Sequence, residues 1–230
     1  MDRRLAFDDL VLAAPTDDFG DEPAARGTAD AVEFRMDLAT DPLDQLAAYD
    51  GELPLIATNR AEWEGGDAPD DPSRLEALGT AADHDAVAAI DIELRSIEGG
   101  DADTLLEHAA DRGVAVIVSV HDFDRTPSEA TLVDLLRRAC EHGAVGKLAV
   151  TAAGPDDVLD VLSATRTLVD EGQRVATMCM GAPGRHSRAI APLYGSCIAY
   201  APVDPARATA PGQYDLATLR SLIEQLRAED

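Results

Sequence analysis

Lys147 is the side chain of this sequence best suited to covalent chemistry. It is the only lysine among 19 basic residues, and it lies in a largely apolar segment, residues 146–150. Removal from water disfavours the ammonium form, and a neutral amine can attack a ketone to give an iminium that serves as an electron sink. A lysine that extends its charge from a strand end into water is the ordinary alternative. Because the rest of the chain contains no lysine, we favour the catalytic interpretation.

His121 directly follows the apolar run of residues 116–120. Its imidazole titrates near neutrality, so it can both accept and donate a proton during a reaction. Taken alone, a histidine at a strand end is more often a structural residue that bonds a neighbouring carbonyl. Its expected position on the strand next to that of Lys147 favours a role in proton transfer.

Arginines and other polar residues in several further segments could bind a small anion. Guanidinium groups grip carboxylates through two parallel hydrogen bonds, and glutamates can orient hydroxyls or a histidine. With 44 acidic residues in the chain, surface ion pairs and solvated carboxylates are the alternative. The candidates are Glu33, Arg35, Arg60, Glu64, Arg188, Thr209 and Gln213.

A metal site has little support in the sequence. There is no HxxxH pattern and no close cluster of histidine and aspartate, so we expect no metal. The three cysteines, at positions 140, 179 and 197, form no CxxC pair and are odd in number, which argues against a zinc cluster or a disulfide framework.

Short apolar segments alternate with longer amphipathic ones along the whole chain, a pattern typical of repeated β-α units around a parallel sheet. Several of the apolar segments have almost no polar residue, as expected for strands buried on both faces. The predicted strands are residues 10–14, 31–34, 54–58, 87–94, 114–120, 144–150, 174–180 and 196–201. The predicted helices are residues 24–29, 42–48, 73–84, 101–111, 127–141, 155–171, 184–191 and 216–227.

Eight such units predict one α/β domain, a (β/α)8 TIM barrel over residues 1–230, with a doubly wound open sheet as the alternative. At one helix start, Thr126 is the expected N-cap, with Pro127 as the first helical residue and Glu129 completing a capping box. In a barrel the active site forms at the C-terminal ends of the strands. All the candidate residues named above fall at those ends or in the loops that follow them.

The formal net charge of −25 sets limits on partners. Such a field repels nucleic acid and anionic membranes, and we expect neither as a partner. An acidic chain with a single lysine is typical of a salt-accumulating halophile. No apolar run approaches the roughly 18–20 residues that span a bilayer, and we expect a cytoplasmic protein.

Seven short segments together resemble the type I 3-dehydroquinate dehydratases of the shikimate pathway. Each is weak alone, but they occur in the family's order and each falls at a predicted strand end. The segments are residues 32–37 (VEFRMD), 60–66 (RAEWEGG), 91–94 (DIEL), 119–123 (SVHDF), 146–149 (GKLA), 178–188 (MCMGAPGRHSR) and 210–213 (APGQ).

The resemblance implies a hydro-lyase that converts 3-dehydroquinate to 3-dehydroshikimate by syn dehydration in aromatic amino acid biosynthesis. Lys147 would form a Schiff base with the ring ketone, so no cofactor is needed. His121 would remove the C2 proton and protonate the departing C1 hydroxyl, and Glu64 would orient His121. Arg188 would bind the substrate carboxylate.

The resemblance also implies that the remaining polar candidates hold the hydroxyls and the carbonyl region of the ring. These are Glu33, Arg35, Arg60, Thr209 and Gln213. We also expect a homodimer. A class I aldolase, which would use the same lysine chemistry in the same fold, and a non-catalytic barrel binding protein are the alternatives.

Overall fold

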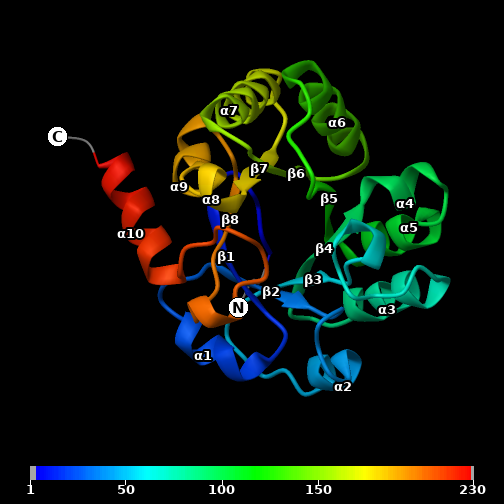
Figure 1. Cartoon of the computed structure of the whole chain (residues 1–230). Helices are drawn as coiled ribbons and strands as arrows, with labels where there is room; N and C mark the ends of the chain where they lie inside the picture. Colours follow the sequence, from blue (N-terminus) through cyan, green and yellow to red (C-terminus); the bar gives the residue numbers. More distant parts are fainter. Residues whose placement is uncertain (1–3, 229–230) are drawn as a thin grey trace.

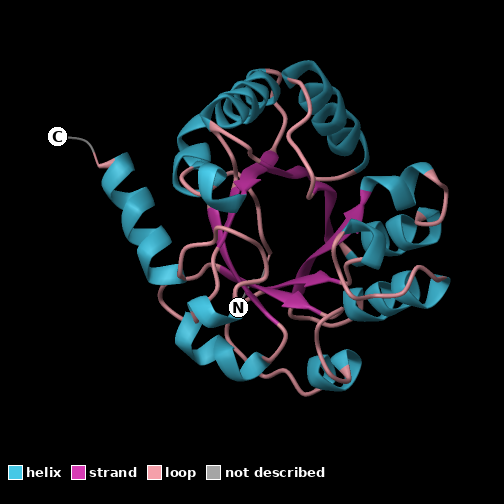
Figure 2. Ribbon diagram, viewed as in Figure 1, coloured by secondary structure: helices cyan, strands magenta, loops and turns pink. Residues whose placement is uncertain are grey.

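Eight parallel strands form a ring at the centre of the molecule, and helices surround it (Figures 1 and 2). The computed structural model describes residues 4–228. Neighbouring strands follow the order β7-β6-β5-β4-β3-β2-β1-β8, and a bridge between Val175 and Ser196 joins β7 to β8. The strands are β1 (Val11–Thr16), β2 (Ala31–Arg35), β3 (Leu55–Thr58), β4 (Val87–Glu93), β5 (Ala115–Asp122), β6 (Val145–Thr151), β7 (Val175–Met180) and β8 (Ile198–Tyr200). The predicted barrel and its strand assignment are therefore confirmed.

The helices lie outside the ring and in the loops above it. The α-helices are α1 (Glu22–Ala25), α2 (Pro42–Ala47), α3 (Pro72–Ala82), α4 (Leu94–Glu98), α5 (Asp103–Arg112), α6 (Glu129–His142), α7 (Pro155–Asp170), α8 (Gly181–Gly184), α9 (Ser187–Ile190) and α10 (Leu216–Arg227). Short 3-10 helices are η1 (Phe19–Asp21), η2 (Glu62–Glu64), η3 (Ala191–Tyr194) and η4 (Pro205–Arg207).

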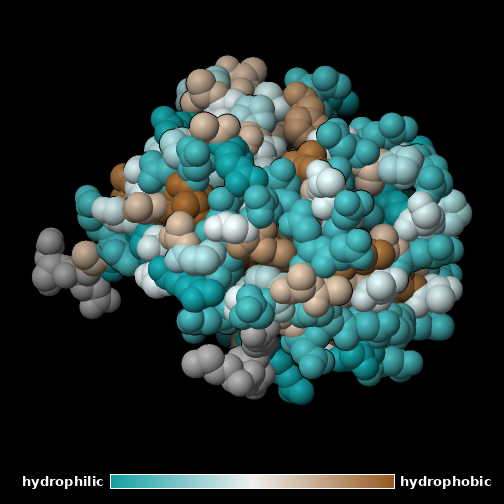
Figure 3. All heavy atoms as spheres, turned by 90° about the horizontal axis from the view of Figure 1, so that it is seen from below, coloured by the Kyte–Doolittle hydropathy of each residue, from teal (hydrophilic) through white to brown (hydrophobic). Residues whose placement is uncertain are grey.

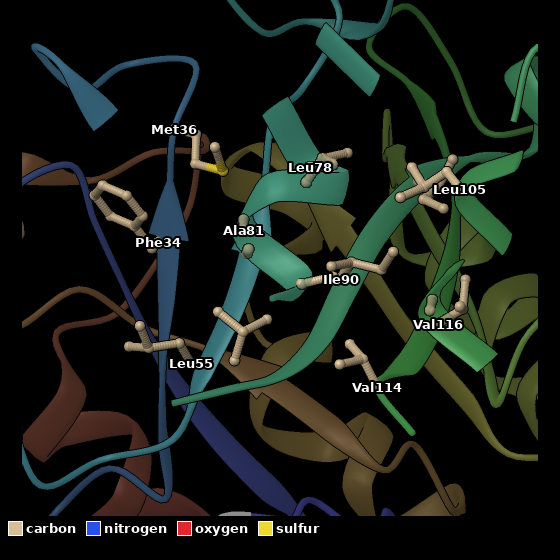
Figure 4. Packing of buried hydrophobic residues seen from close by; sticks show 14 of the residues in the cluster. Phe34, Met36, Leu55, Leu78, Ala81, Ile90, Leu105, Val114 and Val116 are labelled. Atoms are coloured by element: carbon tan, nitrogen blue, oxygen red, sulfur yellow. The ribbon is translucent and has the colours of Figure 1, made fainter. Parts of the chain in front are cut away.

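Alternation along the strands separates an inner from an outer core, because successive side chains of a strand point to opposite faces. In β4 and β6, Ala89, Val145 and Ala149 pack inside the ring, whereas Ile90 and Leu148 pack outward. The outward residues of β2 to β5 meet α3 and α5 in one cluster, part of which is shown in Figure 4. Glu33 on β2 and Lys147 on β6 are charged inner positions, so the ring interior carries charged side chains among apolar ones.

The predicted capping box at Thr126 is wrong. The N-cap of α6 is Ser128, whose side chain makes no capping bond, while the Thr126 hydroxyl donates to the Thr151 carbonyl at 2.9 Å. The Glu129 side chain accepts a hydrogen bond from the Ser163 hydroxyl at 2.5 Å. Thr126 and Glu129 thus bond to residues on β6 and α7 instead of capping the start of α6.

Two predicted helices also differ from those observed. The segment predicted at residues 24–29 forms only α1, which has Pro23 in its first turn and ends before Gly27, whose φ is 75°. The segment predicted at 184–191 is divided among α8, α9 and η3. Glycine in the left-handed region and proline within the first turn explain why the first helix begins and ends early.

The molecular surface is mostly hydrophilic in the view of Figure 3. Arginines on it pair with acidic side chains, as in Arg137–Glu171 at 2.6 Å and Arg138–Glu98 at 2.7 Å. None of the helices within residues 4–228 is both long and apolar enough to cross a membrane. All three cysteines are free thiols; Cys179 and Cys197 are buried, and Cys140 is partly exposed.

Candidate active site

One cavity at the C-terminal ends of the strands brings together every predicted site residue. The strand periodicity explains this convergence, because the inward positions of β2, β5 and β6 place Glu33, His121 and Lys147 over the same apolar interior. The cavity is lined by Glu33, Arg35, Thr58, Arg60, Glu64, Gly65, His121, Phe123, Lys147, Ala149, Met178, Met180, Arg188, Tyr200, Thr209, Ala210 and Gln213.

Lys147 lies on the floor of this cavity, and its side chain is only 5% exposed. Its Nζ is 2.9 Å from Asp91 Oδ2 and 3.6 Å from Glu33 Oε1, and it lies 4.4 Å from the centre of the Tyr200 ring. Burial of Lys147 was predicted from the sequence, but its contacts with Asp91 and Glu33 were not. The amine is therefore held at a fixed point between β2, β4 and β8, with its charge balanced in the substrate-free protein.

His121 and Glu64 form a buried pair beside the lysine. Glu64 Oε1 lies 2.8 Å from His121 Nδ1, and the same oxygen accepts the backbone N–H of His121 at 3.1 Å. When Glu64 is ionised, Nδ1 must donate the proton of this contact, which leaves the Nε2 lone pair free to act as a base. Glu64 thus fixes both the orientation and the tautomer of His121.

Burial acts on both members of this pair. It raises the pKa of Glu64 to about 8, although the nearby Arg60 cation opposes the change. It also lowers the pKa of His121 well below its ordinary value, and the Arg60 and Lys147 cations add to this effect. At neutral pH the pair therefore carries one proton more than the form with ionised Glu64 and neutral His121. That proton must leave before His121 can act as a base.

The loop after β3 fits closely against the histidine. Gly65 has a φ of 81°, and a Cβ atom there would lie 2.3 Å from the Phe123 ring, which in turn stacks on His121 at a centroid distance of 6.0 Å. A Cβ on Gly66 would lie 2.1 Å from the Arg60 carbonyl oxygen. Both glycines are needed for Glu64 to approach His121 from this loop.

Arg60 is occupied by the protein itself. Its Nη2 lies 2.6 Å from Asp91 Oδ1, and its Nη1 lies 2.9 Å from Glu93 Oε1 and 2.7 Å from the Ser119 hydroxyl. Burial alone would lower the pKa of Arg60, but the carboxylates of Asp91 and Glu93 raise it well above its ordinary value. Burial alone would raise the pKa of Asp91, but the Arg60 and Lys147 cations hold it well below its usual range.

The two candidates on β2 also have protein partners. Arg35 makes a two-pronged ion pair with Asp37, at 2.9 Å through Nε and 2.6 Å through Nη2. Glu33 Oε1 accepts the Thr58 hydroxyl proton at 3.0 Å. Their predicted contacts with substrate stay predictions, and any such contact must be shared with Asp37 or Thr58.

Arg188 differs from the other arginines of the cavity. Its Nη2 donates to the Pro211 carbonyl at 3.2 Å, its Nε is buried without a hydrogen-bond partner, and no acidic side chain of residues 4–228 forms an ion pair with it. Burial lowers the pKa of Arg188 to about 10. A buried cation without a counter-ion is a binding site for an anion.

The loop after β8 covers this arginine and is closed by the Gln213 side chain. Gln213 Oε1 accepts the backbone N–H groups of Thr209 at 2.9 Å and Ala210 at 3.2 Å. Gly212 packs on the Gly181 carbonyl, where a Cβ would lie at 2.6 Å. Thr209 and Gln213 therefore shape the loop in addition to lining the cavity.

Sequence reasoning missed Tyr200 and gave no role to Asp91 or Glu93. The Tyr200 hydroxyl is buried without a hydrogen-bond partner among the described residues. Alternation along β8 could have placed it inward, whereas the ion pairs of Asp91 and Glu93 depend on strand register. In the part of the chain that the structure describes, no group of three or more His, Cys, Asp or Glu side chains is arranged to hold a metal ion.

Comparison with known proteins gives concordant matches. The family model described as type I 3-dehydroquinase matches residues 18–230. The 3-dehydroquinate dehydratase of Haloarcula marismortui is 60% identical, over 98% of this chain and 100% of that protein. That of Halobacterium salinarum is 50% identical, over 97% of this chain and 100% of that protein.

Solved structures agree with these sequence matches. The 3-dehydroquinate dehydratase of Geobacillus kaustophilus superposes with a TM-score of 0.85 at 27% identity, covering 96% of this chain and 93% of that one. The type I enzyme of Clostridium difficile with covalently modified comenic acid gives a TM-score of 0.80 at 26% identity, covering 95% and 92%. The fold expected from the sequence is the fold of these structures.

Proposed function

The chain belongs to the type I 3-dehydroquinase family and is a hydro-lyase of the halophilic type, and from this premise we propose that it dehydrates 3-dehydroquinate through an imine on Lys147. Membership in this family decides against the class I aldolase alternative. The retention of Lys147, His121 and Glu64 in one cavity argues against a binding protein without activity.

The proposed reaction uses Lys147 and His121 in turn. The Lys147 amine attacks the ring ketone, and loss of water gives an iminium. His121 removes the C2 proton, and the electrons of that bond form an enamine. The enamine expels the C1 hydroxyl as His121 returns its proton, so a second water leaves. Hydrolysis of the remaining iminium releases 3-dehydroshikimate and restores the amine.

The observation that carries this proposal is the position of Lys147. The only side-chain amine of the chain lies on the buried floor of a cavity whose wall holds the His121–Glu64 pair. Arg188 supports the choice of a carboxylated substrate, because its cation has no acidic partner in the described residues. The related Clostridium difficile enzyme was solved with covalently modified comenic acid.

Reductive trapping tests the proposal. Borohydride added with 3-dehydroquinate is expected to attach one ligand irreversibly to Lys147, located by peptide mass spectrometry. The Lys147→Ala variant is expected to lose both the label and the dehydration activity. A chain that turns over 3-dehydroquinate at the wild-type rate without Lys147 would rule out the imine mechanism.

We further propose a homodimer in the cytoplasm. Leu193, Tyr194 and Leu226 are exposed apolar residues on η3 and α10, which contact each other and could contribute to such an interface. The excess of acidic residues suits the cytoplasm of a salt-accumulating cell. Sedimentation in molar KCl tests the first proposal, for which a monomer is the contrary result, and cell fractionation tests the second.

A further inference from the structure

Arg74 belongs to the outer helix α3, yet its side chain turns inward and is only 2% exposed. Its Nη1 lies 2.7 Å from Glu93 Oε2 and 3.1 Å from the Asn59 carbonyl oxygen, and its Nη2 donates to the Ser96 hydroxyl at 2.9 Å. Arg74 does not line the cavity that holds Lys147. Its effect on any reaction there must pass through the residues that it contacts.

A chain of alternating charges connects Arg74 with the lysine. Glu93 accepts from Arg74 through one carboxylate oxygen and from Arg60 through the other, at 2.7 and 2.9 Å. Arg60 then reaches Asp91 at 2.6 Å, and Asp91 reaches Lys147 at 2.9 Å. Each carboxylate in this series of ion pairs lies between two cations, and all four contacts of the series are buried.

We propose that Arg74 is a positioning residue for the imine chemistry of Lys147, and this inference rests on the function proposed above. By neutralising Glu93, Arg74 leaves Arg60 to be shared evenly between Glu93 and Asp91. Without the Arg74 cation, Glu93 is paired with Arg60 alone. Arg60 then neutralises less of the charge of Asp91, and more of that negative charge acts on Lys147. The surplus negative charge holds the Lys147 nitrogen more strongly, so the amine is less available to attack the ketone.

The groups that face Lys147 from the surrounding strands support an indirect action of Arg74. Two carboxylates and a ring lie closest to the Lys147 nitrogen, and five charged or titratable groups lie farther out in the same cavity. The closest groups are Asp91 on β4, Glu33 on β2 and Tyr200 on β8. The others are Arg35 on β2, Arg60 and Glu64 after β3, His121 on β5 and Arg188 on α9. Of these, Arg60 is the one joined to Glu93 and so to Arg74.

The test separates the charge of Arg74 from its hydrogen bonds. Arg74→Gln can still donate to Glu93 but carries no charge, whereas Arg74→Lys keeps the charge. We expect Arg74→Gln to shift the pH dependence of borohydride trapping on Lys147 upward and to lower kcat about tenfold or more at neutral pH, with KM changed less than about twofold. Arg74→Lys is expected to follow the wild-type pH profile of trapping.

Two further variants distinguish positioning from simple support of the fold. The double variant Arg74→Gln, Glu93→Gln removes one charge of each sign and is expected to bring the pH profile back toward that of the wild type. Ser96→Ala removes one hydrogen bond of Arg74 without changing any charge, and it is expected to lower Tm while leaving the pH profile unchanged. A purely structural role would change Tm in every variant and displace no profile.

The outcomes of this test are separate from those of the proposed function. Wild-type trapping at Lys147 together with an unshifted profile in Arg74→Gln overturns the role of Arg74 and leaves the imine mechanism intact. Absence of trapping in the wild type overturns both. If Arg74→Gln does not fold, Arg74→Lys and the double variant must both keep the wild-type profile, and a displaced profile in either overturns the inference.

Discussion

Arg60 and Arg188 are both buried in the same cavity, at 4% and 3% exposure, but their surroundings are opposite in charge. Arg60 is enclosed by the carboxylates of Asp91 and Glu93, whereas Arg188 donates to the Pro211 carbonyl and has no acidic partner within residues 4–228. The pKa of Arg60 is raised, and burial lowers that of Arg188 to about 10.

The difference indicates which half of the cavity is complete before substrate arrives. Burying a charge is costly unless a partner compensates it, and the half that contains Arg60 provides every partner from the chain itself. The half that contains Arg188 leaves a cation uncompensated. A fold keeps such a violation of ordinary burial rules mainly where a ligand completes it. On the function proposed above, we infer that the paired half performs the chemistry and that the unpaired half binds the anionic group.

The largest expected effect is on the proton-transfer residue of the paired half. His121→Ala should still form the imine, because Lys147 and its partners are unchanged, but it should turn over about 10²–10⁴-fold more slowly. Steady-state kinetics and borohydride trapping on the same preparation measure the two steps. A loss in kcat smaller than about tenfold would assign proton transfer to another group.

Removing Arg60 should lower the stability of the substrate-free protein, whereas removing Arg188 should not. Arg60→Met leaves Asp91 and Glu93 with a buried deficit of positive charge, and it should lower the free energy of unfolding by about 3–5 kcal/mol. Arg188→Met removes a cation that has no counter-ion, so it should leave that free energy unchanged or raise it. Denaturant unfolding at constant KCl compares the two variants. Equal losses of unfolding free energy in the two variants would contradict the difference in charge compensation between Arg60 and Arg188.

A smaller effect is expected when Arg188 is replaced by lysine. Lysine keeps the charge but loses the planar fork, and one lost charge-assisted hydrogen bond should raise KM for 3-dehydroquinate about tenfold. The value of kcat should change less if the carboxylate is held equally in ground and transition states. Wild-type KM should also fall as salt screens the net charge of −25. An unchanged KM in Arg188→Lys would transfer the carboxylate contact to Arg35 or Arg60.

The smallest effect is on pH dependence. A protonated Glu64 donates a hydrogen bond to His121 Nδ1. The imidazole proton then lies on Nε2, the atom whose lone pair must accept the substrate proton. Since the pKa of Glu64 is raised to about 8, kcat/KM should rise with pH toward that value and then level. In Glu64→Gln this rise should disappear, with a lower plateau. A variant that retains the same rise would assign it to a different group.

The sequence predicts the barrel because strand alternation and strand ends are local properties. It also predicts nine site residues that line one cavity in the structure, and their roles stay predictions. Lys147 and His121 could be placed by counting residues along apolar segments. The pairing of Arg60 with Asp91, and of Arg35 with Asp37, could not be predicted in this way. Such contacts depend on strand register and on side-chain rotamers, which no short pattern contains.

Arg74 shows the same limit from another direction. It lies on a helix whose periodicity predicts only an outer layer, and its nearest charged partner is 19 residues away in the chain. The misplaced capping box at Thr126 failed for a related reason, since Thr151 offered its side chain a better-placed acceptor. In both cases a partner from a distant segment replaced the local one.

The single lysine has a practical consequence for chemical labelling. Reductive methylation with isotopically enriched formaldehyde would place its one side-chain dimethylamine at position 147, since the chain contains no other lysine. The NMR spectrum would then hold one lysine resonance without any assignment work, and that resonance would come from the cavity floor. Because the nitrogen is only slightly accessible, its rate of modification would also report how often the cavity opens. Sugars and aldehydes that glycate proteins at lysine would meet a surface with no lysine to react with.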